Sequence, residues 1–473
     1  MPGSLSALVW LPLLAAAGTG ALDDGQALVP PMGLNTWNAF GANISEAVVK
    51  EMADLMESLG LVAAGYRYLV LDDGWSDPER TQDGRLQADR QRFPSGKRPA
   101  CLPNSIKALS GYLAGKGLLL GVYSDSGGFT CQGFPGSRGH EAEDARSFAD
   151  WGVSLLKYDN CYTHDDLLER FVAMRDALNA TGRPILYQLC EWGIGDPWLW
   201  GPRVAHTWRT TFDIHSSWAS VMQNLDESIG LARYAGPGHW NDLDLLEVGT
   251  FGPQPNGWEG VHGASLGPEP GGAWQWATPP RVRGQYLSEK EERAHFALWA
   301  ILKSPLFIAA DLRRMAASSL AILRSKEVIA INQDPLGVPG DLIWKSGPKE
   351  IYAASLSGGG RAVVLHNRHS ILSHLQAANI TVRWAQLGYA PEERAAVRDL
   401  YRQQDLGMHA GSFTAEVRLH DVAVLRITPQ DPQPAQEAWR PWQGQPMFER
   451  HEEDEGWIPE PLRAAEGRQG DQQ

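Results

Sequence analysis

The stretch Ser154-Leu-Leu-Lys-Tyr-Asp-Asn160 is a short apolar run that ends abruptly in charged and polar residues. Its apolar part is typical of a fully buried strand. Lys157 and Asp159 at the end of that strand would be unfavourable in a hydrophobic core. They fit the mouth of a parallel barrel, because active sites form there at the carboxyl ends of the strands. A surface turn that begins a helix would explain this segment equally well, so the rest of the chain decides.

Seven other apolar, strand-like runs alternate with segments of helical character. They are Met32–Trp37, Tyr68–Asp73, Leu118–Asp125, Pro184–Glu191, His206–Asp213, Trp240–Leu245 and Leu306–Asp311. A helical stretch over 45–58 follows the first run, and a capping box, Ser288-Glu-Lys-Glu291, opens an apolar helix before the last. Eight strands that alternate with helices predict an α/β protein built on a (β/α)8 TIM barrel.

Carboxylates gather at the ends of these runs. Seven of the eight runs finish in or near an acid, and the first finishes in Trp37. The acids are Asp72, Asp73, Asp125, Asp159, Glu191, Asp213, Asp242, Asp244 and Asp311. Because the carboxyl ends of barrel strands converge on one face, the sequence predicts an acidic bowl with an aromatic rim.

Changes in composition and hydrophobic pattern along the chain predict four regions. An apolar run from Ala7 to Ala17 followed by small residues indicates a signal peptide over 1–21, too short to span a bilayer. The catalytic barrel is expected over 22–338, with a loop insert rich in Gly, Pro and Trp at 252–283. Short alternating runs then predict an antiparallel β-sandwich domain over 339–430. The remainder, 431–473, is rich in Pro, Glu and Gln and is expected to be disordered.

Charge and targeting signals narrow the class of partner. The formal net charge of −14 argues against nucleic acid and anionic membrane surfaces and suits a neutral small-molecule substrate. The signal peptide places the protein in the secretory pathway, either secreted or at the cell wall, or delivered to a vacuole or lysosome. Sequons at Asn43, Asn179 and Asn379 fit that route as glycosylation sites. The oligomeric state is left open, with a homodimer as one option.

The four cysteines, Cys101, Cys131, Cys161 and Cys190, are too few for a disulfide scaffold. They allow three full pairings, among which the sequence does not choose. None has CxxC spacing and no histidine cluster accompanies them, so a zinc site is not expected. We expect neither a metal nor a cofactor.

A bowl of carboxylates without histidines suggests sugar chemistry. Glycoside hydrolysis needs one acid that attacks or stabilises the anomeric carbon and a second that protonates the leaving oxygen. Asp159 has Lys157 two residues upstream on the same strand face, and a nearby ammonium favours the ionised carboxylate that a nucleophile requires. Asp213 follows Arg209 by four residues and is the candidate acid/base.

Eight ordered motifs resemble glycoside hydrolase family 27, the retaining α-galactosidases of plant and lysosomal type, from about Leu28 to Pro429. The matching segments are Pro31-Met-Gly-Leu-Asn-Thr-Trp-Asn38, Leu71-Asp-Asp-Gly-Trp75, Gly84-Arg-Leu-Gln-Ala-Asp89, Lys157-Tyr-Asp-Asn-Cys161, Leu189-Cys-Glu-Trp192, Trp208-Arg-Thr-Thr211 with Asp213, Trp240-Asn-Asp242 with Asp244, and Asn332-Gln-Asp-Pro-Leu-Gly337. One such motif alone is weak, whereas eight in order are specific.

The resemblance implies a TIM barrel that releases terminal α-galactose by double displacement, with Asp159 as nucleophile and Asp213 as acid/base. It also implies a Cys131–Cys161 disulfide beside the nucleophile. Bulky Glu191-Trp192 resembles galactose-specific members rather than those that accept an N-acetyl group. The implied substrate-binding residues are Trp37, Asp72, Asp73, Tyr123, Lys157, Glu191, Trp192, Arg209 and Asp244.

Several alternatives stay open at this point. Asp72 and Asp73 would also serve as a helix cap, Trp37 as plain core, and Cys161 as a free buried thiol. A β-L-arabinopyranosidase, an α-N-acetylgalactosaminidase and an inactive galactose-binding protein are the competing functions. The chain also departs from many relatives in lacking one disulfide, because Gly41, Ala42 and Gly74 stand where its two cysteines are expected.

Overall fold

The structure is a computed structural model that describes residues 24–95, 105–163, 166–250, 286–369, 376–430 and 439–440. The predicted signal peptide, the predicted insert and Cys101 lie outside these residues. So does the predicted disordered tail, except for residues 439 and 440. Among the described residues, no helix combines the length and apolar character needed to cross a bilayer.

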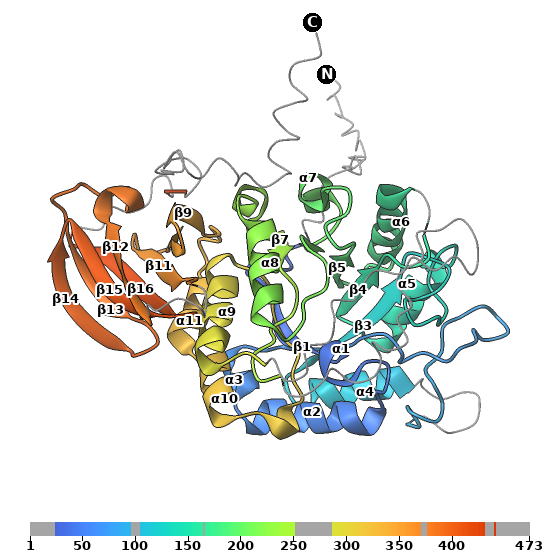
Figure 1. The fold of residues 1–473 in the computed structure, drawn as a ribbon. Coiled ribbons are helices and arrows are strands. Elements are labelled where there is room, and N and C mark those ends of the chain that lie inside the picture. Colours follow the sequence, from blue (N-terminus) through green and yellow to red (C-terminus); the bar gives the residue numbers. More distant parts are fainter. Residues whose placement is uncertain are drawn as a thin grey trace, which may run out of the picture.

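Eight parallel strands form the predicted barrel (Figure 1). Consecutive strands pair in sequence order, and β1 also pairs with β8. Leu246 closes the remaining gap between β7 and β8, since it forms a parallel bridge with Ile308. The strands are β1 Met32–Asn35, β2 Tyr68–Leu71, β3 Leu119–Asp125, β4 Leu155–Asp159, β5 Leu186–Cys190, β6 Thr207–Arg209, β7 Trp240–Asp242 and β8 Leu306–Ile308.

Helices surround the barrel strands (Figure 1). Two predicted starts are confirmed: Ser45 caps α2 by accepting from the Val48 amide, and Ser288 with Glu291 forms the capping box of α9. The longer helices are α2 Glu46–Ser58, α4 Ser105–Ala114, α5 Glu141–Trp151, α6 Leu167–Ala180, α8 Trp218–Ser228, α9 Glu289–Ile301, α10 Ala317–Leu323 and α11 Lys326–Asn332. Three single turns are α1 Trp37–Phe40, α3 Leu61–Ala64 and α7 Pro197–Trp200.

The first motif of the chain needs glycine at Gly33 because two strands approach closely there. A Cβ atom at Gly33 would lie 2.4 Å from the Tyr68 carbonyl oxygen and 2.8 Å from the Phe307 ring. Both contacts are shorter than carbon atoms tolerate, so a larger residue would push β1 away from its neighbours. This position therefore sets the spacing of β2, β1 and β8.

The C-terminal region is an antiparallel sandwich, as predicted. A six-stranded sheet has the order β14-β13-β16-β11-β10-β9, and β12 pairs with β15 in a second sheet. Ile380, Val382 and Trp384 pack with Ile351 and Val363 in one buried apolar cluster. The strands are β9 Asp341–Ser346, β10 Lys349–Ser355, β11 Arg361–Asn367, β12 Ala377–Arg383, β13 Arg394–Asp399, β14 Gln404–Ala410, β15 Ser412–Arg418 and β16 Val422–Pro429.

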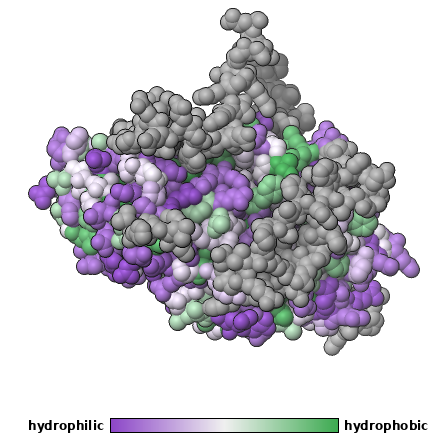
Figure 2. All heavy atoms as spheres, viewed as in Figure 1, coloured by the Kyte–Doolittle hydropathy of each residue, from purple (hydrophilic) through white to green (hydrophobic). Residues whose placement is uncertain are grey.

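The sandwich lies at one end of the molecule, with α9 between it and the barrel strands (Figure 1). Tyr352, Val364 and Val424 project from the six-stranded sheet into the same apolar cluster as the barrel. Residues 294–301 of α9 are buried throughout, as expected for a helix covered on both sides. The described surface is mainly hydrophilic over the C-terminal sheets (Figure 2).

A charged cluster ties the two parts together. Arg368, which follows β11, donates to Asp226 of α8 at 2.6 and 2.8 Å and to Glu350 of β10 at 2.9 Å. Glu350 is fully buried, and it also accepts from Tyr352 at 2.9 Å and pairs with His366 at 3.0 Å. These partners satisfy a carboxylate that burial alone would strongly disfavour.

Arg368→Ala should lower the free energy of unfolding by about 3 kcal/mol, because it breaks the pair with Asp226 and leaves the buried Glu350 carboxylate with Lys345, at 3.2 Å, in place of two cationic partners. The change should appear as a lower midpoint in urea denaturation followed by tryptophan fluorescence. Arg146→Ala is the matched control, since the Arg146–Glu143 pair is exposed and should change stability by less than about 1 kcal/mol. Equal midpoints for the two variants would contradict the structural role of this cluster.

Candidate active site

Asp159 ends β4 at the centre of the barrel mouth and is almost fully buried. The Tyr123 hydroxyl of β3 donates to Asp159 Oδ2 at 2.8 Å, and the Asn160 amide donates to Oδ1 at 2.9 Å. Each carboxylate oxygen therefore has a donor that fixes its orientation. A nucleophile held this way meets its substrate without first having to reorganise.

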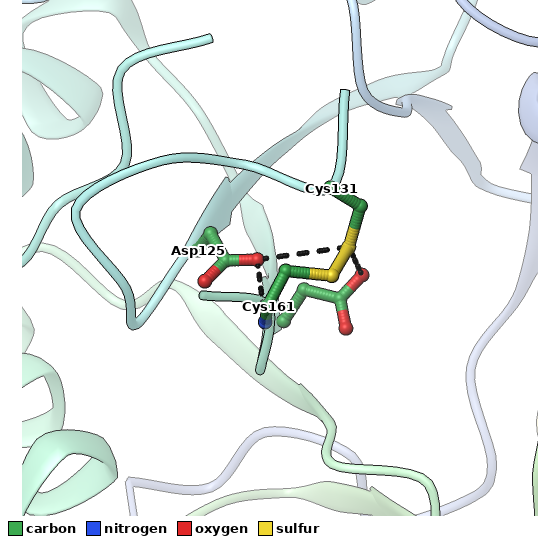
Figure 3. A group of neighbouring side chains, drawn as sticks. Asp125, Cys131 and Cys161 are labelled. Carbon is green, nitrogen blue, oxygen red and sulfur yellow. Dashed lines mark hydrogen bonds between the residues drawn. A yellow bond between two sulfur atoms is a disulfide. The ribbon is translucent and has the colours of Figure 1, made fainter. Parts of the chain in front are cut away.

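The Cys131–Cys161 disulfide lies directly against this carboxylate (Figure 3). Cys131 Sγ is 3.4 Å from Asp159 Oδ2, and the Cys161 amide donates to Asp125 Oδ2 at 3.1 Å. Asp125 and Asp159 are register partners on β3 and β4, so the disulfide joins the loops that follow two neighbouring strands. The pairing that the family resemblance implied is present, and Cys190 is a buried free thiol.

Asp125, Cys131, Asp159 and Cys161 also form a group compact enough to suggest a metal site. Both sulfur atoms are joined to each other and cannot act as thiolate ligands. Two carboxylates remain, with backbone amides on Asp125 and a hydroxyl on Asp159. The group is therefore better described as the support of the Asp159 carboxylate than as a cation site.

The Asp72–Asp73 pair faces the mouth from the end of β2. Lys157 Nζ and Asn35 Nδ2 both lie 2.7 Å from Asp72 Oδ2. The Gln132 amide donates to Asp73 Oδ2 at 2.9 Å. No helix begins between residues 72 and 95, so the described chain does not use this pair as a helix cap.

Arg209 of β6 holds two acids at once on the opposite part of the rim. Its NH1 donates to Asp213 Oδ1 at 3.0 Å, and its NH2 lies 3.0 Å from Asp244 Oδ2. The Asp213 side chain is 40% exposed, whereas that of Arg209 is 3% exposed. Asp213 thus has a fixed position but faces solvent, which a group that exchanges protons with leaving groups and water requires.

Burial and neighbouring charges shift the pKa values of the acids at the barrel mouth. Burial raises the pKa of Asp159 to about 6; the Lys157 ammonium lowers it and the Asp213 charge raises it further. Burial likewise raises the pKa of Asp244 to about 6; the charge of Arg209 lowers this pKa, and that of Asp213 raises it. Lys157 therefore lowers the pKa of Asp159 as expected, but the effect of burial is larger.

Glu191 is fully buried directly after β5, and within the described part of the chain neither carboxylate oxygen has a hydrogen-bond partner. Burial raises its pKa well above the usual range, which favours the neutral carboxyl, a form that can donate a hydrogen bond. A buried polar group without a partner is costly, and such groups often await a ligand. Trp192 follows with a positive φ of 59°, an uncommon conformation for a bulky residue.

The structure brings most of the predicted residues together but excludes one strand-end acid. Asp311 pairs with Arg313 at 2.7 Å and caps the short 3-10 helix at 312–314, so it does not line the acidic bowl. Two contributors were not predicted as site residues: Asn35, through its bond to Asp72, and Gln132, through its amide bond to Asp73. Asn35 lies inside the first conserved-looking motif, whereas Gln132 carries no sequence signal beyond its position after Cys131.

Comparison with known proteins gives one answer over nearly the whole described chain. The family model described as Alpha galactosidase A matches residues 29–258 and 257–334, and that of the Alpha galactosidase C-terminal beta sandwich domain matches 346–427. Alpha-galactosidase A of Cellvibrio japonicus is 44% identical over 425 residues, covering 85% of this chain and 93% of that protein. Alpha-galactosidase 3 of Arabidopsis thaliana is 42% identical over 414 residues, covering 86% and 84%.

Solved structures agree with these relatives. The α-galactosidase of Saccharomyces cerevisiae, solved with raffinose, superposes with a TM-score of 0.72 at 29% identity. The match covers 86% of this chain and 99% of that one.

The buried carboxyls predict an acidic optimum of stability. Burial is the largest cause in each case: it raises the pKa of Asp73 and Glu247 to about 7, and that of Asp159, Asp244 and Asp341 to about 6. In the unfolded chain these groups titrate near pH 4. Between about pH 4 and 7 the folded protein therefore binds more protons, and its free energy of unfolding falls as pH rises.

The melting temperature measured by scanning calorimetry at constant ionic strength should be several degrees higher near about pH 5 than near about pH 7.5. Glu350 has the opposite sign, since its pKa is lowered to about 2 and its contribution is lost as pH falls below about 4.5. Asp73→Asn should flatten the alkaline decline, because it removes one of the titrating groups. A melting temperature that rises steadily up to about pH 7.5 would contradict the assignment.

Proposed function

Since the chain belongs to the alpha-galactosidase A family of glycoside hydrolases, we propose that it is a retaining exo-α-galactosidase. Its substrates would be terminal α-D-galactosyl residues of oligosaccharides, glycolipids or polysaccharides. One observation carries the proposal: the same barrel holds a buried Asp159, oriented by hydrogen bonds on both oxygens, and a solvent-facing Asp213, held by Arg209.

The first step forms a covalent glycosyl-enzyme. Asp159 in its ionised form attacks the anomeric carbon, and the bond to the leaving oxygen breaks. Asp213 gives its proton to that oxygen, so the aglycone departs as a neutral alcohol. The positive charge that develops on the sugar ring is stabilised by the surrounding carboxylates, which burial keeps away from competing water.

The second step restores the enzyme. Asp213, now ionised, takes a proton from a water molecule that attacks the anomeric carbon. The bond to Asp159 breaks, and galactose leaves with its original α configuration. The exposure of Asp213 suits this step, because water and the departing alcohol use the same side of the ring.

Recognition of galactose would fall to the buried acids and cations around the nucleophile. Asp72 and Asp73 have the geometry to accept from neighbouring hydroxyls, with Lys157 and Arg209 as donors. Neutral Glu191 would donate to a hydroxyl near the anomeric carbon, and Trp192 beside it leaves little room for an N-acetyl group. Such contacts discriminate strongly, since a wrong sugar leaves buried groups unpaired. Trp37, Tyr123 and Asp244 complete the proposed set.

Further assignments remain part of this proposal. Residues 22–338 would form the catalytic unit and 339–430 the C-terminal unit, with entry to the secretory pathway through the 1–21 segment. Asn43, Asn179 and Asn379 are all exposed, as glycosylation would require.

A panel of nitrophenyl glycosides tests the function. Hydrolysis should be fastest for the α-galactoside, and far slower for its N-acetyl analogue and the β-L-arabinopyranoside. Proton NMR of the first minutes should show α-galactose before mutarotation. Asp159→Ala should lower kcat by several orders of magnitude while the variant still unfolds in one cooperative transition, because no other group replaces the covalent step.

Each alternative function has its own outcome in the panel. Preference for the N-acetyl or the arabino substrate would establish one of the other two activities. No turnover by wild type, with galactose still bound, would identify an inactive binding protein. A fluorosugar that traps the enzyme on a peptide without Asp159 would refute the nucleophile assignment.

Asp213→Asn should affect substrates according to their leaving groups. Natural disaccharides leave as poor alcohols that need a proton, so kcat/KM should fall by about 100-fold or more. Dinitrophenyl galactoside leaves without protonation and its first step should be nearly normal. Steady-state and burst kinetics with both substrates separate the steps. An equal loss for both substrates in the first step would exclude Asp213 as the general acid.

A further inference from the structure

Two exposed aromatic side chains stand beside the catalytic carboxylates without being part of the buried pocket. Phe129 is 56% exposed and Tyr162 is 41% exposed, and their rings form an edge-to-face pair with centroids 6.2 Å apart. Large apolar side chains at such exposure are uncommon in a well-packed loop and often mark a binding surface. We call Phe129 and Tyr162 the rim pair.

The disulfide fixes the rim pair close to the nucleophile. Tyr162 follows Cys161 directly, and Phe129 precedes Cys131 by two residues. Because Cys131 Sγ is 3.4 Å from Asp159 Oδ2, both rings rise from backbone that lies next to the reacting centre. Figure 3 shows the Cys131–Cys161 disulfide with Asp125 beside it.

The loop that carries Phe129 is rigid by construction. Phe129 forms a bridge with Pro135, and the Gly136 amide donates to the Gly128 carbonyl at 3.0 Å. A Cβ atom at Gly127 would lie 2.1 Å from the Cys161 carbonyl oxygen, so only glycine lets this loop press against the segment of Tyr162. The two rings are therefore presented without the entropy cost of ordering a flexible loop.

Hydrogen bonds to Asn160 hold the segment that carries Tyr162 in place. Arg170 of α6 donates to Asn160 Oδ1 at 3.1 Å, and the Thr163 hydroxyl donates to the Asn160 carbonyl at 3.1 Å. Tyr162 itself has a positive φ of 48°, which a β-carbon disfavours. The surroundings thus hold an aromatic residue outward in a conformation that it would not choose by itself.

Burial divides the mouth into two levels. The acids proposed to bind galactose, such as Asp72, Asp73 and Asp159, are at most 6% exposed, whereas the rim pair is largely open. A terminal galactosyl unit in the buried pocket would place its leaving oxygen toward the exposed Asp213, hence toward the rim. The next ring of the substrate then lies at the level of Phe129 and Tyr162.

We propose that the rim pair is the binding site for the pyranose ring directly attached to galactose through the scissile bond. The aliphatic C–H face of that sugar packs on the aromatic rings, whose faces carry negative charge density. The proposal rests on the proposed α-galactosidase function and names the substrates that it prefers: galactosyl oligosaccharides rather than simple galactosides.

The test compares a substrate that has this second ring with one that lacks it. Melibiose releases glucose as its leaving group, whereas α-galactosyl fluoride releases fluoride ion and offers the rim pair no sugar ring. Phe129→Ala and Tyr162→Ala should each lower kcat/KM for melibiose by about 3- to 10-fold. Their kcat/KM for the fluoride, and the inhibition constant of free galactose, should stay within about two-fold of wild type.

Two further variants make the result specific. Tyr162→Phe keeps the ring and should retain most of the melibiose rate. Met408→Ala removes a comparably exposed apolar side chain from β14 of the C-terminal sheet and should change neither substrate. Melting curves of all variants show whether the fold is intact.

The two hypotheses fail in different ways. A wild-type enzyme that cleaves neither substrate would refute the α-galactosidase function itself. An active wild type whose alanine variants lose both substrates equally, or lose neither, would refute the rim pair as a sugar site while leaving that function intact.

Discussion

The constraint on which this structure depends is the burial of several carboxylates at one end of a single barrel. Asp72, Asp73, Asp125, Asp159 and Asp244 are all nearly inaccessible to water. Buried carboxylates gathered at one end of a barrel cannot all ionise unless positive charges or hydrogen bonds compensate them. Two cations, Lys157 and Arg209, lie among these acids. The acids with which they pair decide which carboxylate is left without a salt bridge.

Lys157 and Arg209 pair with different acids. Lys157 pairs with Asp72, and Arg209 is shared by Asp213 and Asp244, so each cation is engaged with an acid other than Asp159, the proposed nucleophile. Asp159 is left with hydrogen bonds from neutral donors and a raised pKa. A carboxylate that is not neutralised by a salt bridge remains a better nucleophile, while the nearby cations keep it ionised often enough to react.

Much of this arrangement followed from sequence. Apolar runs that alternate with helical segments identified all eight strands, and seven of these runs end in or near an acid. Because strand ends in a parallel barrel must meet, the acidic mouth was predictable. The pairing of charges was not. Lys157 and Asp72 lie 85 positions apart in the chain, and only the closed barrel brings them to 2.7 Å. Asp311 was wrongly expected at the acidic mouth for the same reason. It follows β8 as the other acids follow their strands, but its carboxylate accepts from Arg313, two residues later, in a local helix cap.

The C-terminal sandwich has a part in the chemistry through α8, which begins soon after Asp213. Asn224 of α8 donates to the Phe212 carbonyl at 3.2 Å, which anchors the segment that carries the acid. The other side of α8 packs on the sandwich, where the Trp218 ring stacks on His420 with centroids 5.0 Å apart and Asp226 pairs with Arg368. Asp213 lies beyond its strand and is half-exposed, so it needs this external support more than Asp159 does. The sandwich thus supports, through α8, the segment that carries Asp213, while Arg209 of the barrel holds its carboxylate.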